Sequence, residues 1–127
     1  MGKNPESSLT RRFRLFGTRK QTSILILIGM LEESYSSEIA RLAGVKISTV
    51  QNYVQAMELS GVLVTRPIGK ERRISLNPRF FAINELKSLL EKLSIAEPEL
   101  NERVSRVRRR PRRMGKPLRP ISEELRR

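Results

Sequence analysis

The side chains of this sequence whose types and spacing could do chemistry lie between residues 47 and 60. At about 100° per residue, one arc of a helix over this segment would carry small, uncharged hydrogen-bonding groups, namely Ser48, Gln51, Asn52 and Gln55. Asparagine and glutamine amides pair bidentately with adenine N6 and N7, and serine hydroxyls donate or accept at several base edges. This arc could also be a solvated helix surface. The absence of the Glu/Lys pairs usual on an exposed helix favours base reading.

Two short helices around a glycine turn would position these side chains. Ser36 or Ser37 can cap a first helix that ends at Gly44, with Glu38 in its first turn. The second helix is expected over residues 47–60, before Gly61, and the side opposite the polar arc is apolar: Val50, Tyr53, Val54 and Met57. This pattern is typical of a helix-turn-helix, in which the second helix lies in the major groove of DNA.

The start of the second helix has two interpretations. Lys46 stands where the helix can begin, and a lysine there is well placed for a phosphate. Ser48 and Gln51 instead have the spacing of a capping box. If Ser48 is the cap, base contacts would fall more on Asn52 and Gln55.

Residues 62–76 alternate in polarity around Gly69 and Lys70, which predicts a β-hairpin with Ile74 and Leu76 facing inward. Four cations lie on or beside its loop: Arg66, Lys70, Arg72 and Arg73. A basic hairpin directly after a recognition helix is a wing that can reach phosphates or the minor groove. A solvated turn is the alternative.

Two further segments are strongly apolar. Residues 22–33 are apolar on nearly all sides, which predicts a helix buried on more than one face, with a buried strand as the alternative. Asn77 and Pro78 offer a cap and a first-turn proline for another helix with a broad apolar stripe. Because a small domain cannot easily bury both helices, we expect a homodimer through one or both, at Ile24, Leu27, Leu31, Leu86, Leu90 and Leu93.

Charge divides the 127 residues into three parts. The net charge of +13 splits into +5 over residues 1–20, +2 over 21–96 and +6 over 97–127. We therefore predict a basic N-terminal arm at 1–20, a folded domain at 21–96 and an arginine-rich, disordered tail at 97–127. Such arms favour a polyanion.

The tail contains a dense basic tract over residues 103–119, with nine Arg or Lys and no acid. Its candidate phosphate or minor-groove contacts are Arg108, Arg109, Arg110, Arg112, Arg113 and Lys116. Residues 114–117 (MGKP) faintly resemble the centre of an AT-hook, although Met114 replaces the leading arginine. A sequence-independent electrostatic anchor is the simpler interpretation.

Composition excludes several classes. The chain has no cysteine and no histidine, which excludes disulfides, zinc ribbons and histidine-dependent catalysis. The apolar run ILILIGML is far shorter than the roughly 20 residues that span a bilayer. We expect a cytoplasmic, nucleoid-associated protein without cofactor, metal or membrane contact, and not an enzyme.

Residues 15–93 resemble the winged helix-turn-helix regulators of bacteria and archaea, especially the ArsR-like and MarR-like groups. The matching segments are LFGTRKQTSILILIGML, SSEIARLAGVKISTVQNYVQAMELSGVLVTR and the wing RPIGKERRISLNP. The resemblance implies a dimer on a short inverted repeat, with Ser48, Thr49, Gln51, Asn52 and Gln55 at the recognition positions. The lack of cysteine and histidine argues against the metal response of some ArsR-like members.

We therefore expect a mainly α fold with a small β-hairpin, a winged helix-turn-helix with basic flexible arms. The expected function is that of a homodimeric, sequence-specific regulator of transcription that binds double-stranded DNA and acts as a repressor. The alternatives are a basic RNA-binding or ribosome-associated winged helix, a nucleoid or architectural DNA-binding protein, and a winged helix used for protein interaction.

Overall fold

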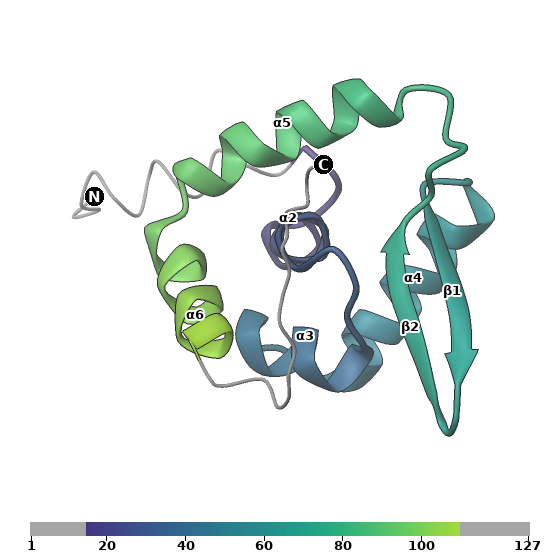
Figure 1. Cartoon of the computed structure of the whole chain (residues 1–127), viewed down its shortest axis with the longest axis horizontal. Helices are drawn as coiled ribbons and strands as arrows, with labels where there is room; N and C mark the ends of the chain where they lie inside the picture. The colour runs from purple at the N-terminus through teal and green to yellow at the C-terminus, as the bar shows by residue number, and fades with distance from the viewer. Residues whose placement is uncertain (1–14, 110–127) are drawn as a thin grey trace, which may run out of the picture.

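The computed structural model describes residues 15–109. Its elements follow in the order α2 (Arg19–Leu31), α3 (Ser36–Ala43), α4 (Ile47–Leu59), β1 (Leu63–Ile68), β2 (Glu71–Leu76), α5 (Ile83–Ile95) and α6 (Pro98–Arg109). Helix α2 lies in the centre, α5 crosses it on one side, α3 and α4 lie on the other, and α6 and the hairpin stand at opposite flanks (Figure 1). The expected mainly α fold with one small hairpin is confirmed.

Helix α2 is the core of the domain. It begins three residues earlier than expected, inside the region assigned to the N-terminal arm, because Thr18 and Gln21 form a capping box. All five residues from Ile24 to Ile28 are fully buried, since α3, α5, α6 and β2 pack around the helix. The segment is a helix, so the alternative of a buried strand is excluded.

Helix α6 corrects the expected domain boundary. Residues 98–109 were expected in a disordered tail, but they form a helix whose Leu100 and Val104 are buried in the core, with Val107 half-buried beside them. The expectation rested on the dense charge of this segment and missed that Leu100, Val104 and Val107 have the helical spacing i, i+4, i+7. Pro98 also stands at the first helical position, where proline is favoured. Nothing structural is described beyond residue 109.

The apolar residues expected at a dimer interface lie within one chain. Ile24 and Leu27 are fully buried, Leu86, Leu90 and Leu93 are at most 8% exposed, and Leu31 is half-buried. A Cβ on Gly29 would lie 3.0 Å from a methyl group of Leu90, so this glycine lets α5 approach α2 closely. The expectation was wrong because α6 supplies the additional cover that lets a small domain bury both apolar helices.

The start of α5 also differs from the expectation. The helix begins at Ile83, five residues after Pro78. The Asn77 side chain donates to the carbonyl oxygen of Gly61 at 2.9 Å and accepts from the backbone N–H of Arg79 at 2.9 Å. Asn77 thus closes a local turn and ties that turn to the segment that follows α4. An Asn-Pro pair can start either a helix or a turn, and here it forms a turn. Within residues 15–109, no helix is long and apolar enough to cross a membrane.

Candidate nucleic-acid interface

Gly44 makes the turn between the two helices of the motif. Its φ of 71° and ψ of 37° are left-handed, and its N–H and that of Val45 both bond the carbonyl oxygen of Ala40. The predicted glycine end of the first helix is confirmed. The predicted serine cap is wrong, because Ser36 and Ser37 lie inside the first turn and the cap position is Tyr35, without a side-chain hydrogen bond.

The start of α4 is settled in favour of Lys46. Lys46 occupies the cap position, with its carbonyl oxygen accepting from the N–H groups of Thr49 and Val50. Ser48 is therefore the second residue of the helix, and the capping-box interpretation is excluded. The side chains of Ser48 and Gln51 are free of that task.

The two sides of α4 separate as the spacing predicted. Val50, Tyr53 and Val54 are at most 5% exposed, and Met57 is half-buried. The Tyr53 hydroxyl donates to the carbonyl oxygen of Phe16 at 3.1 Å, which ties α4 to the segment before α2. Burial raises the pKa of Tyr53 well above its ordinary value, so the phenol stays a neutral donor at physiological pH.

The opposite side of α4 is the candidate reading face, formed by the exposed side chains of Ser48, Gln51, Asn52 and Gln55. Thr49 is half-buried at its edge. In the described part of the chain, none of these four exposed side chains has a hydrogen-bond partner. Their donors and acceptors are available to another molecule.

The hairpin is the predicted one, and its alternation sorts its cations onto two sides. Antiparallel pairing sets Thr65 opposite Ile74 and Pro67 opposite Arg72. Because Ile74 is buried, this face of the hairpin is turned inward and carries Thr65 and Arg72. Arg66 and Arg73 stand opposite each other in the strand register, and their side chains lie on the other face.

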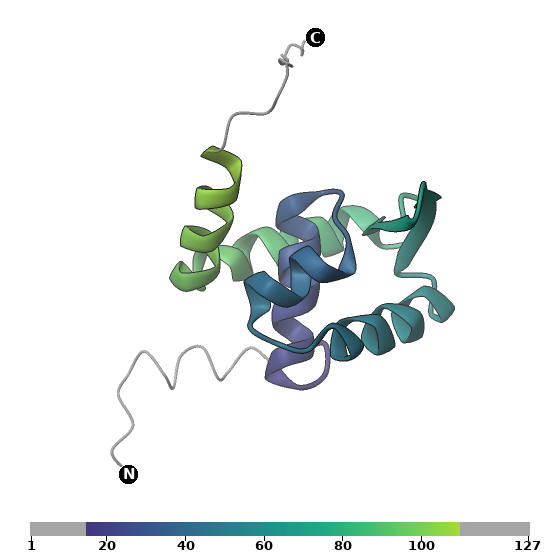
Figure 2. The ribbon, with the colours of Figure 1, turned by 90° about the horizontal axis from the view of Figure 1, so that it is seen from below.

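The inner face of the hairpin shares a groove with the reading face. Thr65 Oγ1 donates to the Glu58 carboxylate of α4 at 2.9 Å, and Arg72 donates to the same Thr65 oxygen. The groove has a volume of about 590 Å³ and is lined by Gln51 and Gln55 from α4 and by Lys70 and Arg72 from the hairpin, among others. Figure 2 shows the hairpin standing beyond the end of α4. Two of the predicted wing cations therefore lie beside two of the predicted base readers.

The outer face of the hairpin is clamped by Glu33, in the loop after α2. Its carboxylate pairs with Arg66 through one oxygen and with Arg73 through the other, the latter at 3.4 Å. The Arg73 guanidinium also lies 5.9 Å from the ring centroid of Tyr35. These two arginines are engaged by their own chain. No spacing rule pointed to Glu33, because its partners lie 33 and 40 residues away.

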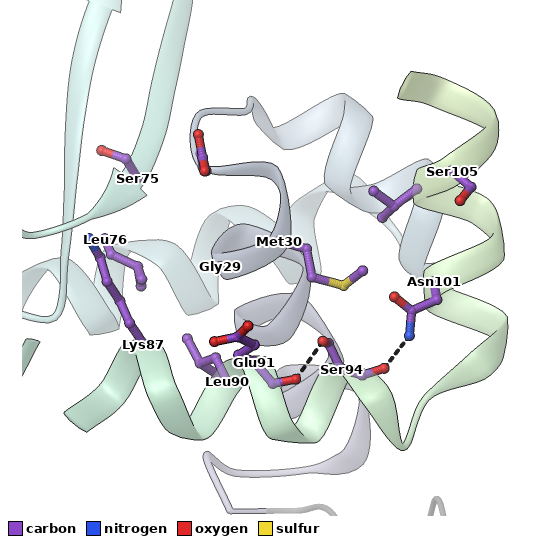
Figure 3. A pocket seen from close by; sticks show the side chains of 12 residues that line it. Gly29, Met30, Ser75, Leu76, Lys87, Leu90, Glu91, Ser94, Asn101 and Ser105 are labelled. Carbon is purple, nitrogen blue, oxygen red and sulfur yellow. Dashed lines mark hydrogen bonds between the residues drawn. The ribbon is translucent and has the colours of Figure 1, made fainter. Parts of the chain in front are cut away.

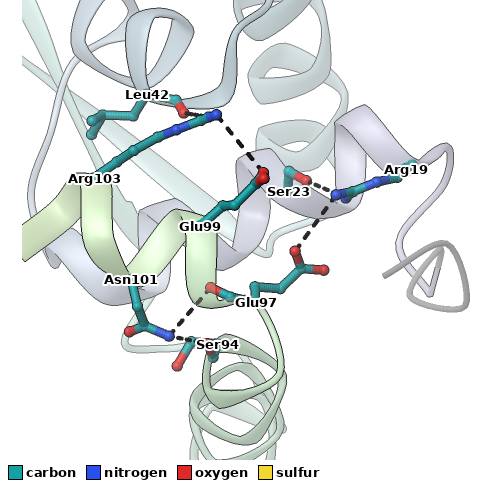
Figure 4. Close-up of polar contacts among 8 residues, drawn as sticks. All are labelled: Arg19, Ser23, Leu42, Ser94, Glu97, Glu99, Asn101 and Arg103. Carbon is teal, nitrogen blue, oxygen red and sulfur yellow. Dashed lines mark hydrogen bonds and ion pairs between the residues drawn. The ribbon is translucent and has the colours of Figure 1, made fainter. Parts of the chain in front are cut away.

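Helix α6 braces the helix-turn-helix through polar contacts as well as apolar ones (Figure 4). Arg103 donates to the carbonyl oxygen of Leu42 at 2.6 Å, at the end of α3. Glu97, 2% exposed, lies 3.6 Å from Arg19 at the start of α2. Burial raises the pKa of Glu97 above its usual range, and the charge of Arg19 offsets part of that rise. Sequence reasoning missed the link between Arg19 and Glu97, since it assigned Arg19 to the basic N-terminal arm and Glu97 to the disordered tail.

The cations predicted in the tail are only partly placed. Arg108 and Arg109 lie in the last turn of α6. The other four cations lie outside the described residues: Arg110, Arg112, Arg113 and Lys116. Residues 114–117, which resemble an AT-hook, lie outside them as well.

No protein-family model and no curated protein sequence matches the chain. Among solved structures, the chain is similar to the homodimeric winged helix-turn-helix DNA-binding domain of a possible ArsR-family transcriptional regulator from Mycobacterium bovis. The likeness has a TM-score of 0.51 at 16% identity and covers 77% of this chain and 93% of that domain. At this identity the comparison establishes the fold, and the chain has the winged helix-turn-helix fold that its sequence predicted.

Proposed function

We propose that this protein is a sequence-specific regulator of transcription that binds double-stranded DNA as a homodimer. The observation that carries the proposal is the reading face. Three amides and a hydroxyl are exposed and unpaired on the second helix of the motif, and two of the amides line the groove that holds Lys70 and Arg72. Free amides suit the edges of bases, and cations beside them suit the neighbouring phosphates.

The cations of the domain have two roles: some contact DNA phosphates, and others hold the wing in place. We assign phosphate contact to Lys46, Lys70 and Arg72, which are exposed. Arg66 and Arg73, paired with Glu33, hold the angle of the wing. The basic segments at 1–14 and 110–127 add affinity that does not depend on sequence and weakens with salt.

The similar domain from Mycobacterium bovis is homodimeric and DNA-binding, which supports both parts of the proposal. We take repression as the outcome, since a bound domain of this size excludes other proteins from its site. Such a protein would act in the cytoplasm, at the nucleoid.

Selection from random duplex DNA tests the function. The full chain is expected to select a symmetric motif. A variant with Arg110, Arg112 and Arg113 replaced by glutamine should select the same motif with lower affinity. Its slope of log affinity against log salt should be shallower by up to about three, since each lost phosphate contact removes roughly 0.9. Failure to enrich any duplex motif, together with binding to single-stranded or structured RNA, would support the RNA-binding alternative instead.

The dimer needs a new interface, because five of the six residues first expected there are buried and Leu31 is half-buried. Leu89 and Ile95 of α5 are 38% and 74% exposed, and they lie about 120° apart around the helix. Ile95 lies opposite the buried stripe of α5, and Leu89 lies at the edge of that stripe. We propose that the exposed surface of α5 that carries these two side chains meets its copy. Large apolar side chains exposed on one helix are consistent with a protein contact surface.

Changing both Leu89 and Ile95 to glutamate should convert the dimer into a monomer, because two charges would be buried against their own copies. Sedimentation equilibrium at tens of micromolar, about the range of ordinary affinities, measures the change. Leu59→Glu is the matched control, since Leu59 is 85% exposed at the end of α4 and outside the proposed interface. If the wild-type chain is monomeric at these concentrations, the proposed homodimer is wrong. If the double variant is still a dimer, the interface lies elsewhere.

A further inference from the structure

A second cavity, of about 910 Å³, lies between α2, the end of β2, α5 and α6 and shares no lining residue with the groove of the reading face (Figure 3). Its walls are apolar where α5 and α6 face α2. Leu90 and Val104 are buried, and Met30 and Leu76 are half-buried. This volume is within the range of small-molecule sites, roughly 300 to 1,000 Å³.

The polar groups inside the cavity present acceptors. The Asn101 amide nitrogen donates to the carbonyl oxygens of Ser94 and Glu97, which fixes the amide and leaves its oxygen without a donor among the described residues. The Ser94 hydroxyl donates its hydrogen bond to the carbonyl oxygen of Glu91 at 2.7 Å. The Ser94 oxygen can therefore act toward a ligand only as an acceptor. A ligand that donates hydrogen bonds is therefore matched to this interior.

The rim of the cavity is acidic in a chain of net charge +13. It carries the carboxylates of Glu32 and Glu91 and one ammonium, that of Lys87. None of the three forms an ion pair within residues 15–109. Glu32 also has a φ of 69°, a conformation that L residues rarely adopt. Two carboxylates without an ion pair on the rim of a cavity whose interior offers acceptors favour a cation.

We propose that this cavity binds a small organic cation, an ammonium group on an apolar body. The body would pack against Leu90 and Val104, and the ammonium would lie at the rim that carries the carboxylates of Glu91 and Glu32. Displacement of water from the apolar walls and attraction to the two carboxylates both favour such a ligand.

The cavity touches both supports of the DNA-binding elements. Asn101, Val104 and Ser105 line it from α6, whose Arg103 bonds the end of α3. Ser75 and Leu76 line it from the end of β2. A bound cation would therefore contact the brace of the helix-turn-helix and the root of the wing, and change DNA affinity. This regulatory consequence rests on the proposed function, whereas the binding site itself does not.

Titration of the ¹⁵N-labelled full chain with three compounds of similar shape tests the site. Phenethylammonium, 2-phenylethanol and phenylacetate differ mainly in charge. Amide shifts are expected in residues that line the cavity, with phenethylammonium binding at least about tenfold more tightly than the alcohol, and the acid most weakly. Glu32→Gln with Glu91→Gln should reduce the cation to the affinity of the alcohol. Glu85→Gln, on α5 but outside the cavity, is the matched control and should leave it unchanged.

Equal affinities for the three compounds, or shifts located elsewhere, would overturn the proposal. So would cation binding that emerges only after Arg110, Arg112 and Arg113 are changed to glutamine, because the chain's own arginines would then be the occupant. The titration is made without DNA, so a failed DNA selection would refute the proposed function and leave the site standing. The regulatory consequence is supported if phenethylammonium shifts DNA affinity in the wild type and not in the Glu32→Gln, Glu91→Gln variant.

Discussion

Replacing Leu100 by alanine lowers the free energy of unfolding by about 2 to 5 kcal/mol, the cost of removing a buried leucine side chain and leaving a cavity. Leu100 is 5% exposed and belongs to the hydrophobic core together with Val104. The loss is a large fraction of the stability of a small domain. Urea denaturation followed by circular dichroism measures it.

Leu59→Ala is the control for the Leu100 variant. Leu59 is the same residue type at the end of α4 but is 85% exposed and lies outside the proposed dimer interface, so little apolar area returns to water on truncation and the loss should be clearly smaller. Equal losses for the two variants would contradict the placement of α6 in the core. A chain ended near Ala96 would lack α6 altogether, and we expect it to fail to fold stably.

The parts of the fold that the sequence predicted are those set by local physics. Gly44 supplies a left-handed residue and the Gly69 turn joins two alternating strands, and neither needs distant contacts. Helix α6 could not be recognised by charge, because nine of its twelve residues are proline, polar or charged and hide a short apolar stripe. Its burial depends on α2 and α3, which only the folded chain brings to it.

The site was predictable on the helix and only partly on the wing. Helical spacing separates Val50 and Val54 from Gln51 and Gln55 without further information, and the structure places them so. Strand alternation could have set Arg72 apart from Arg66 and Arg73, but their engagement depends on Glu33, which a turn after α2 brings beside the hairpin. Local pattern thus identifies which side chains are exposed, and tertiary packing decides which cations remain free.

Replacing Asn52 or Gln55 by alanine should relax the choice of base at one position of the selected motif, at a cost of about 1 to 3 kcal/mol there. The two residues lie about 60° apart on the exposed side of α4, so the two variants should relax different positions. Gln55 lines the groove beside Arg72, whereas Asn52 does not, and the position that Gln55 reads should be the nearer to the wing contact. Selection with each variant, followed by affinity measurements on the wild-type site and its single-base substitutions, gives both quantities.

Two controls separate base reading from general weakening. Asn84→Ala removes an exposed amide from α5, away from the reading face, and should change neither motif nor affinity. Arg72→Ala should weaken all duplexes alike, since a phosphate contact carries no sequence information. If Asn52→Ala instead lowers affinity equally for every duplex, Asn52 does not read a base, and sequence choice must be sought in Ser48, Gln51 and Gln55. None of these substitutions alters the buried side of α4 that carries Val50 and Tyr53, so we expect every variant to keep the fold, and circular dichroism of each variant checks this.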